Sequence, residues 1–225
     1  NNDGLSSNPS QDASEKLKLA FEDNSITIGN IAFAKETPKS DDIKQDLLIA
    51  SVKSATIENL LSDMLKNSNN IYAEQLLIST AHKAKNDVSE ETLNQFMDES
   101  IKLIFSDSES LKYLNASGFS YNSTISCKQL LEIIDSSAQN NVDLISLSSK
   151  ANEDGTLTER FKSYKGTLQA KTGTLDGVTA LLGKINEKTF SLIVNGQFSE
   201  DQGHIYQEKA VEILSQFPSI KNLKL

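Results

Sequence analysis

The chain has 225 residues, 37% of them hydrophobic, and a formal net charge of −9. Such an acidic chain lacks the basic surface that nucleic acid requires, so we expect no nucleic-acid partner. The hydrophobic content is sufficient for a core, and the length allows one large domain or two small ones. The sequence contains neither a signal peptide nor an apolar run that approaches the length of a membrane span.

Cysteine and histidine are too few to suggest a metal or redox site. Cys127 is the only cysteine, which excludes an internal disulfide and a thiolate metal site. We expect it to pack in the core at the start of a helix. His82 and His204 stand in no recognisable motif, so no metal and no cofactor are predicted.

The first quarter of the chain predicts a leader followed by a mixed segment. Residues 1–11 are polar and are expected to be flexible. Residues 12–23 carry apolar side chains at helical spacing. Strands are expected near residues 26–34 and 47–52.

The remainder predicts helices followed by a sheet. From residue 56 to about residue 161 the apolar spacing is mainly helical, with polar breaks near Lys85, Ser106, Ser117 and Asn140. Three strands are expected near residues 167–174, 178–186 and 189–196, and a helix over about 202–217. Strands joined by such short turns pair in antiparallel fashion, so the predicted fold class is α+β with an antiparallel sheet.

The first of these three strands contains the sequence KTGT at residues 171–174. KTG is one of three signatures of serine acyl-transfer enzymes that process D-Ala-D-Ala peptides or β-lactam rings, the others being SxxK and an SDN-type triplet. A Lys at a sheet edge can also serve only to prevent unwanted strand pairing. Lys171 alone therefore suggests this chemistry without deciding it.

Three SxN triplets occur, starting at Ser6, Ser68 and Ser120. Only Ser68 lies between two helical apolar stripes, so its context selects it as the second signature. Ser68 and Asn70 are then expected at a helix junction. A purely structural role for Ser68 as a helix cap is the alternative.

Four segments, in order, resemble the low-molecular-mass penicillin-binding proteins that act as D-alanyl-D-alanine carboxypeptidases and endopeptidases. Residues 56–77 are similar to the SxN region of that family, and residues 115–120 to its D-[GA]-S-G-[LF]-S turn. Residues 153–160, EDGTLTER, resemble its DGTL-x-x-R segment, and residues 170–183 resemble AKTGTL-x-GV-x-x-L-x-G. One departure is Asn115, which stands where the family usually has Asp.

The resemblance implies roles for six residues. Ser68 would pass a proton to the leaving D-Ala amine, Asn70 would orient the substrate amide, and Lys171 would provide the positive field that binds the terminal carboxylate. The remaining three would bind substrate: Thr172 through its hydroxyl, Gly173 by allowing close approach of the substrate backbone, and Thr174 through a main-chain N–H in an oxyanion hole.

The nucleophile signature is missing, because no Ser in the chain is followed by Lys three positions later. In the family, SxxK lies upstream of SxN and inserted domains separate the two, so the chain is expected to begin inside or just after such an insertion. The resemblance then assigns residues 1–11 to a leader, 12–53 to the end of the inserted domain and a return segment, and 54–225 to the C-terminal part of a transpeptidase-like domain. Within that part, residues 54–165 would be helical and 166–225 would form the sheet and terminal helix.

A partial transpeptidase-like fold, without its N-terminal strands and SxxK helix, should leave an apolar groove beside Ser68 and the KTGT strand. The missing N-terminal half or another protein chain is expected to cover it. The implied substrates are peptidoglycan stem peptides ending in D-Ala-D-Ala, with β-lactams as inhibitors, in the periplasm or cell envelope. The chain by itself would be inactive.

Two other functions stay open. A non-catalytic relative could retain SxN and KTGT as a cleft that binds peptidoglycan or a partner protein. A β-lactamase shares SDN and KTG, but the EDGTLTER segment and the region before residue 56 fit it poorly.

Three further features have structural interpretations. Arg160, the only Arg, is expected to form an ion pair that joins the segment around Gly155 to a helix. Glu153 and Asp154 should form a turn before a short helix. Ser117 and Gly118 are expected to form a structural turn.

Overall fold

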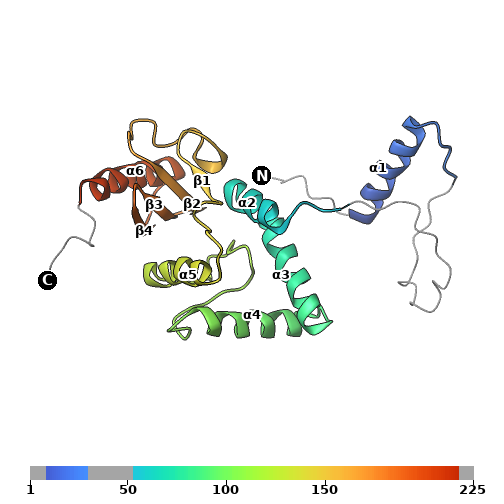
Figure 1. The fold of residues 1–225 in the computed structure, drawn as a ribbon, viewed down its shortest axis with the longest axis horizontal. Coiled ribbons are helices and arrows are strands. Elements are labelled where there is room, and N and C mark those ends of the chain that lie inside the picture. The colour runs from blue at the N-terminus through green and yellow to red at the C-terminus, as the bar shows by residue number, and fades with distance from the viewer. Residues whose placement is uncertain (1–8, 30–52, 218–225) are drawn as a thin grey trace. The chain divides into compact units, whose positions relative to one another are not determined.

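The computed structural model describes residues 9–29 and 53–217 (Figure 1). The chain divides into two compact units, Asn1–Lys53 and Ser54–Leu225. In the first unit, helix α1 spans Pro9–Asp23 and begins three residues before its predicted start. Residues 26–29 form no strand, and the rest of the predicted strand to residue 34, like the strand predicted at 47–52, lies outside the described residues.

The second unit begins with helices that start at capping side chains. The helices are α2 (Ile57–Asn67), α3 (Asn70–Lys85), α4 (Glu90–Ile104) and α5 (Cys127–Gln139). Each follows a polar residue whose side chain accepts a main-chain N–H of the first turn, namely Thr56, Asn69, Ser89 and Ser126. Such caps satisfy donors that have no partner inside the helix, so the sequence itself sets these starts.

The helical prediction fails after α5, where residues 140–165 contain no α-helix, and also between α4 and α5. Residues 105–126 form an irregular loop in which Lys112 and Thr124 make an isolated antiparallel bridge. Gly118 in this loop has a φ of +71°, a conformation that a continuous helix cannot contain. Residues 105–126 therefore form a separate non-helical segment between α4 and α5.

The sheet contains β1 (Ser149–Lys150), β2 (Leu168–Leu175), β3 (Val178–Ile185) and β4 (Lys188–Asn195), all antiparallel and in that order. The three long strands agree closely with the prediction. The sequence did not predict β1, because two residues carry no periodic signal. A short 3₁₀ helix, η2 (Gly155–Leu157), follows β1 directly after Glu153 and Asp154, as predicted.

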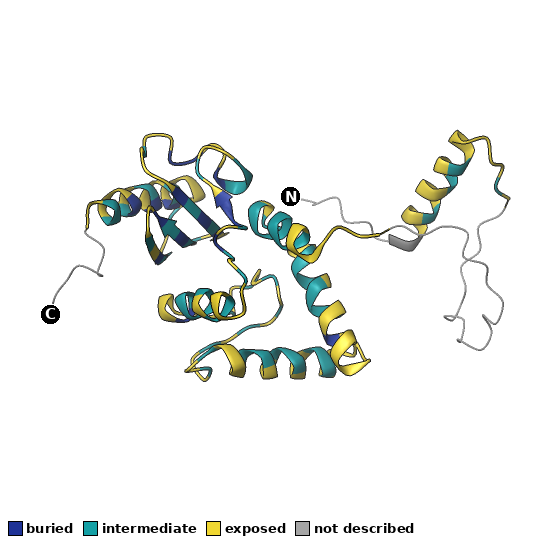
Figure 2. Cartoon of the chain, viewed as in Figure 1, coloured by how far each residue is buried: buried dark blue, intermediate teal, exposed yellow. Residues whose placement is uncertain are grey.

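Helix α6 (Glu200–Gln216) covers one face of this sheet (Figure 1). The buried core lies between them, as the dark residues of Figure 2 show, and consists of Leu157, Phe161, Leu168, Ala170, Leu181, Ile185, Phe190 and Val211. Side chains alternate across a strand, so the residues between these point to the opposite face. That opposite face is where Lys171 lies.

Candidate active site

Ser68 occupies the junction between α2 and α3. It has left-handed backbone angles (φ 51°, ψ 47°), and its N–H donates to the Met64 carbonyl at the end of α2. The neighbouring Asn69 caps α3 by accepting the N–H of Tyr72 at 3.2 Å. Because Asn69 performs the side-chain capping, the hydroxyl of Ser68 is available to another group.

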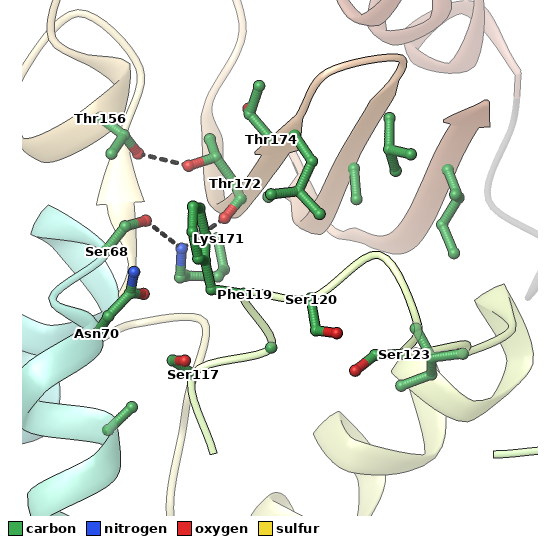
Figure 3. A pocket seen from close by; sticks show the side chains of 18 of the residues that line it. Ser68, Asn70, Ser117, Phe119, Ser120, Ser123, Thr156, Lys171, Thr172 and Thr174 are labelled. Carbon is green, nitrogen blue, oxygen red and sulfur yellow. Dashed lines mark hydrogen bonds between the residues drawn. The ribbon is translucent and has the colours of Figure 1, made fainter. Parts of the chain in front are cut away.

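That group is Lys171, on β2. Its Nζ donates a hydrogen bond to Ser68 Oγ and another, at 2.5 Å, to the Thr172 carbonyl (Figure 3). Burial lowers the pKa of Lys171 from 10.5 to about 8. Among the described residues Lys171 forms no ion pair, so its charge has no carboxylate partner within this part of the chain.

Asn70, the first residue of α3, is exposed. Figure 3 shows its side chain beside Ser68, on the same side of the pocket. The structure thus brings together Ser68, Asn70 and Lys171, the three residues for which the sequence predicted catalytic roles.

The outer edge of β2 is open next to these residues. β1 pairs only with Gln169 and Ala170, which leaves residues 171–175 without a partner strand on that side among the described residues. The Leu168 carbonyl accepts the Ala151 N–H on this side. Main-chain groups alternate in direction along a strand, and the register with β3 is unbroken, so the N–H of Thr174 points to the open edge.

Gly173 has space around it. A Cβ built on this glycine would meet only the Cβ of Ala180, at 3.6 Å, which is an ordinary van der Waals distance. The packing of the chain therefore does not require glycine here. A requirement would come from something that approaches the strand from outside.

A pocket of about 1100 Å³ joins these elements. Its walls are the α2–α3 junction, the strand face that carries Lys171, and the loop around Phe119. Apolar side chains from β3, β4 and α5 complete it, including Ala180, Ile193 and Leu130. It lies where the sequence predicted a groove beside Ser68 and the KTGT strand.

The loop wall is held by Glu74 of α3. Its carboxylate accepts the main-chain N–H of Ala116 at 3.3 Å and that of Ser117 at 2.9 Å. The predicted turn at Ser117 and Gly118 is therefore present, and both residues also line the pocket. Glu74 has no sequence signal for this role, since its partners lie more than 40 positions away.

The same loop contacts the sheet through Tyr121, whose hydroxyl accepts the Asp176 N–H at 3.0 Å. Phe119 is 65% exposed and lines the pocket (Figure 3). Phe119 belongs to segment 115–120, which resembles the family turn, but the sequence predicted no role for it. Tyr121 lies outside that segment and carried no positional signal.

Two expectations about other residues need correction. Arg160 makes no ion pair among the described residues; its Nη2 donates instead to Gln207 Oε1 of α6 at 2.7 Å, and burial lowers its pKa. The predicted link to a helix exists, but a neutral amide provides it. Cys127 is exposed rather than packed in the core: it is the first residue of α5, and its helical face is covered only further along the helix, where Leu130, Leu131 and Ile134 are partly buried.

Among the described residues, no group of three or more His, Cys, Asp or Glu side chains could hold a metal ion. No described helix is both long and apolar enough to cross a membrane. The available chemistry is a lysine ammonium hydrogen-bonded to a serine hydroxyl, at an open strand edge, inside a large pocket.

Comparison with known proteins identifies the family of the chain. The model of the D-Ala-D-Ala carboxypeptidase 3 (S13) family matches residues 5–217, which is most of the chain. The chain belongs to this S13 family. Carboxypeptidase DacB of Mycolicibacterium smegmatis is 28% identical to it over 165 residues, covering 65% of this chain and 35% of that protein.

Solved structures of other proteins have the same fold as this chain. Penicillin binding protein 4 (dacB) of Haemophilus influenzae, complexed with a β-lactam, aligns with a TM-score of 0.68 at 20% identity over 91% of this chain and 51% of its own. A predatory endopeptidase of Bdellovibrio bacteriovorus, in complex with an immunity protein, gives a TM-score of 0.57 at 21% identity over 92% of this chain and 56% of its own. The chain thus spans about half the length of these relatives.

Proposed function

We propose that this chain provides the proton-transfer and substrate-binding part of a serine-type D-alanyl-D-alanine carboxypeptidase or endopeptidase that cleaves peptidoglycan stem peptides and is acylated by penicillin. The hydrogen bond from Lys171 Nζ to Ser68 Oγ carries the proposal. Lys171 is the donor in this bond, so the hydroxyl proton of Ser68 is free to point into the pocket. This arrangement supports a role for Ser68 as proton donor to a leaving amine, a role that requires hydrogen-bond reach to that amine.

The charge of Lys171 supports the proposed role of this residue in binding the terminal carboxylate of the substrate. With a pKa of about 8, Lys171 is mostly cationic at neutral pH, and no carboxylate of the described residues neutralises it. A terminal D-Ala carboxylate in the pocket would supply the missing partner, with Thr172 donating a further hydrogen bond. Gly173 would leave room for the peptide backbone along β2.

Acyl transfer also needs a nucleophile and an oxyanion hole. The N–H of Thr174 at the open edge of β2 would be one oxyanion donor. The nucleophilic Ser of an SxxK helix, and the second N–H, would come from a segment outside the printed sequence that packs into the pocket beside Ser68. Without that segment the chain would be inactive. We also propose a location in the periplasm or cell envelope, where this substrate occurs.

The test uses the complete protein that carries this chain and measures its acylation rate by labelled penicillin. Ser68→Ala and Lys171→Ala should each slow acylation by about 10²–10⁴-fold, the usual contribution of a general acid–base group. Ser163→Ala and Lys184→Ala serve as controls, because both side chains lie outside the pocket. Wild-type labelling of either pocket variant would show that the wrong residues have been selected.

The absence of SxxK from the printed sequence favours a second candidate, a non-catalytic relative that binds stem peptides or a partner protein. The intact mass of the protein from its own cell envelope after penicillin treatment separates the two. A species well above 24.7 kDa with one penicilloyl adduct supports the peptidase. An unlabelled species of 24.7 kDa supports the binding protein.

A further inference from the structure

A chain of hydroxyl groups runs from the pocket to the end of α2, and the proposed chemistry does not yet use it. Thr172 Oγ1 donates to Thr156 Oγ1 at 2.9 Å (Figure 3). Thr156 contacts Ser149 twice, through its N–H to Ser149 Oγ at 3.2 Å and between the two hydroxyls at 3.4 Å. Ser149 Oγ then donates to the Lys66 carbonyl at 2.9 Å. The three hydroxyls come from β2, η2 and β1. The hydrogen-bonded chain that they form ends at Lys66, two residues before Ser68.

The chain of hydroxyl groups is rigid because the space around it is filled. Ser149 is fully buried and Thr172 is 9% exposed. A Cβ on Gly155, which has a φ of +57°, would lie 2.3 Å from Ser149 Oγ and 2.4 Å from the Lys66 carbonyl oxygen. No other residue than glycine fits there without displacing one of these atoms. The hydroxyl of Thr156 is thereby held at a fixed position relative to Thr172.

The protons of this chain can be arranged in two ways. The Lys66 carbonyl has no proton to offer, so Ser149 must donate to it. Thr156 has no such restriction: its hydroxyl can accept from Thr172, or it can rotate and donate to Thr172 instead. In the second arrangement Thr172 uses its own proton elsewhere. Only hydroxyl rotations separate the two, and no covalent bond is made or broken.

An anion in the pocket would select the second arrangement. Thr172 and Thr156 both line the pocket beside the ammonium of Lys171. A carboxylate that accepts a hydrogen bond from Thr172 would turn the Thr172 proton toward the ligand, and Thr156 would then donate to a lone pair of Thr172 Oγ1. A hydrogen bond to a charged acceptor is stronger than one between two hydroxyls, which favours this rotation.

We propose that Thr156 and Ser149 are positioning residues for recognition of the ligand carboxylate, acting through Thr172. This inference rests on the proposed function, because it takes the ligand to be a peptide with a free C-terminal carboxylate. Thr156 fixes the rotamer of Thr172 and donates to it when the ligand is bound. Ser149 holds Thr156 and connects it to the last turn of α2, which leads to Ser68.

The experiment compares two ligands in the complete protein, a peptide ending in D-Ala-D-Ala and the same peptide with a C-terminal amide. Binding is measured by calorimetry where the peptide is not turned over, and as KM beside kcat where it is. Thr156→Val removes the hydroxyl at nearly constant volume, Thr156→Ser retains it, and Ser149→Ala tests the next member. Thr189→Val, at an exposed position of β4, is the matched control.

Thr156→Val and Ser149→Ala should weaken binding of the acid by about three- to tenfold, because Thr172 loses its orientation and not its hydroxyl. Binding of the amide and kcat should change little, and Thr156→Ser should restore binding of the acid. Equal losses for acid and amide, or wild-type binding of the acid by Thr156→Val, would overturn the proposal, as would wild-type protein that does not prefer the acid.

Failure of the proposed function has a different signature. A protein that penicillin never acylates, but whose preference for the acid depends on Thr156, would be a binding protein in which the positioning chain still operates. A protein that is acylated normally while Thr156→Val binds the acid as the wild type does would be a peptidase without this device.

Discussion

Lys171 hydrogen-bonds Ser68 across 103 positions of sequence, and within the described part of the chain neither side chain bonds another side chain. One residue lies on β2 and the other at the turn between two helices. The pair therefore exists only when the sheet and the helical part are correctly docked. Its properties report on that docking as well as on the proposed chemistry.

The lowered pKa of Lys171 predicts that acylation depends on pH in the alkaline range. Burial places this pKa at about 8, so the ammonium is lost as the pH rises above that value. In the complete protein, the acylation rate with a carboxylate-bearing penicillin should fall between pH 8 and pH 10. Lys171→Arg keeps its charge in this range, so any acylation activity it retains should not fall with pH.

Stability should change in the opposite direction over the same range. Unfolded Lys171 has its ordinary pKa of 10.5, so between pH 8 and pH 10.5 the unfolded state binds more protons than the folded state, and stability rises with pH. Chemical denaturation at pH 7.5 and pH 9.5 measures this. The rise should be smaller in Lys171→Met; an equal rise in that variant would assign it to other groups.

Local patterns were sufficient to predict the three long strands and to select three polar residues that the structure brings together. Lys171, Ser68 and Asn70 belong to short motifs whose neighbours are adjacent in sequence, and hairpin strands pair with their neighbours. The sequence could not predict β1, which has two residues and exists because it pairs with Ala170 and Gln169. Propensity alone does not encode such a tertiary contact.

The supporting residues of the site escaped prediction for the same reason. Glu74, Ser149 and Thr156 act through partners that tertiary packing places beside them. The interpretation of Arg160 was correct about the attachment to a helix but wrong about its partner, because Gln207 offers an amide that no charge pattern reveals. Cys127 was assigned to the core from its residue type, whereas its position at the start of α5 leaves it exposed.

Replacement of Glu74 should reduce the order of the loop that forms one wall of the pocket. Glu74→Ala removes both acceptors of the Ala116 and Ser117 N–H groups. Hydrogen exchange of residues 115–120 should accelerate, and acylation efficiency should fall by about tenfold since a pocket wall is no longer fixed. Glu91→Ala, at an exposed position of α4, should change neither quantity. Unchanged exchange in Glu74→Ala would show that the loop is held by other contacts.

Replacement of Gln207 should lower the stability of the fold, although this residue does not line the pocket. It is fully buried, accepts from Arg160, and donates to Thr179 Oγ1 at 2.5 Å. Gln207→Leu would leave a buried guanidinium without this acceptor and should lower the free energy of unfolding by about 3 kcal/mol. Gln95→Leu, on exposed α4, should lower it by less than about 0.5 kcal/mol. Denaturant unfolding of the complete protein compares the two variants. Equal losses would contradict the large contribution to stability expected from the hydrogen bond between Arg160 and Gln207.

Gly173 and Gly183 lie on paired strands of the same sheet, but alanine substitutions at the two positions should affect stability differently. A Cβ at Gly173 meets nothing closer than 3.6 Å, whereas one at Gly183 would lie 2.2 Å from the Gln169 carbonyl oxygen and 2.4 Å from the Ala170 Cβ. Gly173→Ala should therefore fold with an unchanged melting temperature, and Gly183→Ala should be destabilised by about 1–3 kcal/mol or more through overpacking. Acylation by penicillin should nevertheless fall at least about tenfold in Gly173→Ala, because its methyl group occupies the path along which a ligand approaches β2. Normal acylation in a folded Gly173→Ala would mean that ligands do not approach this strand closely, and the open edge of β2 would need another explanation.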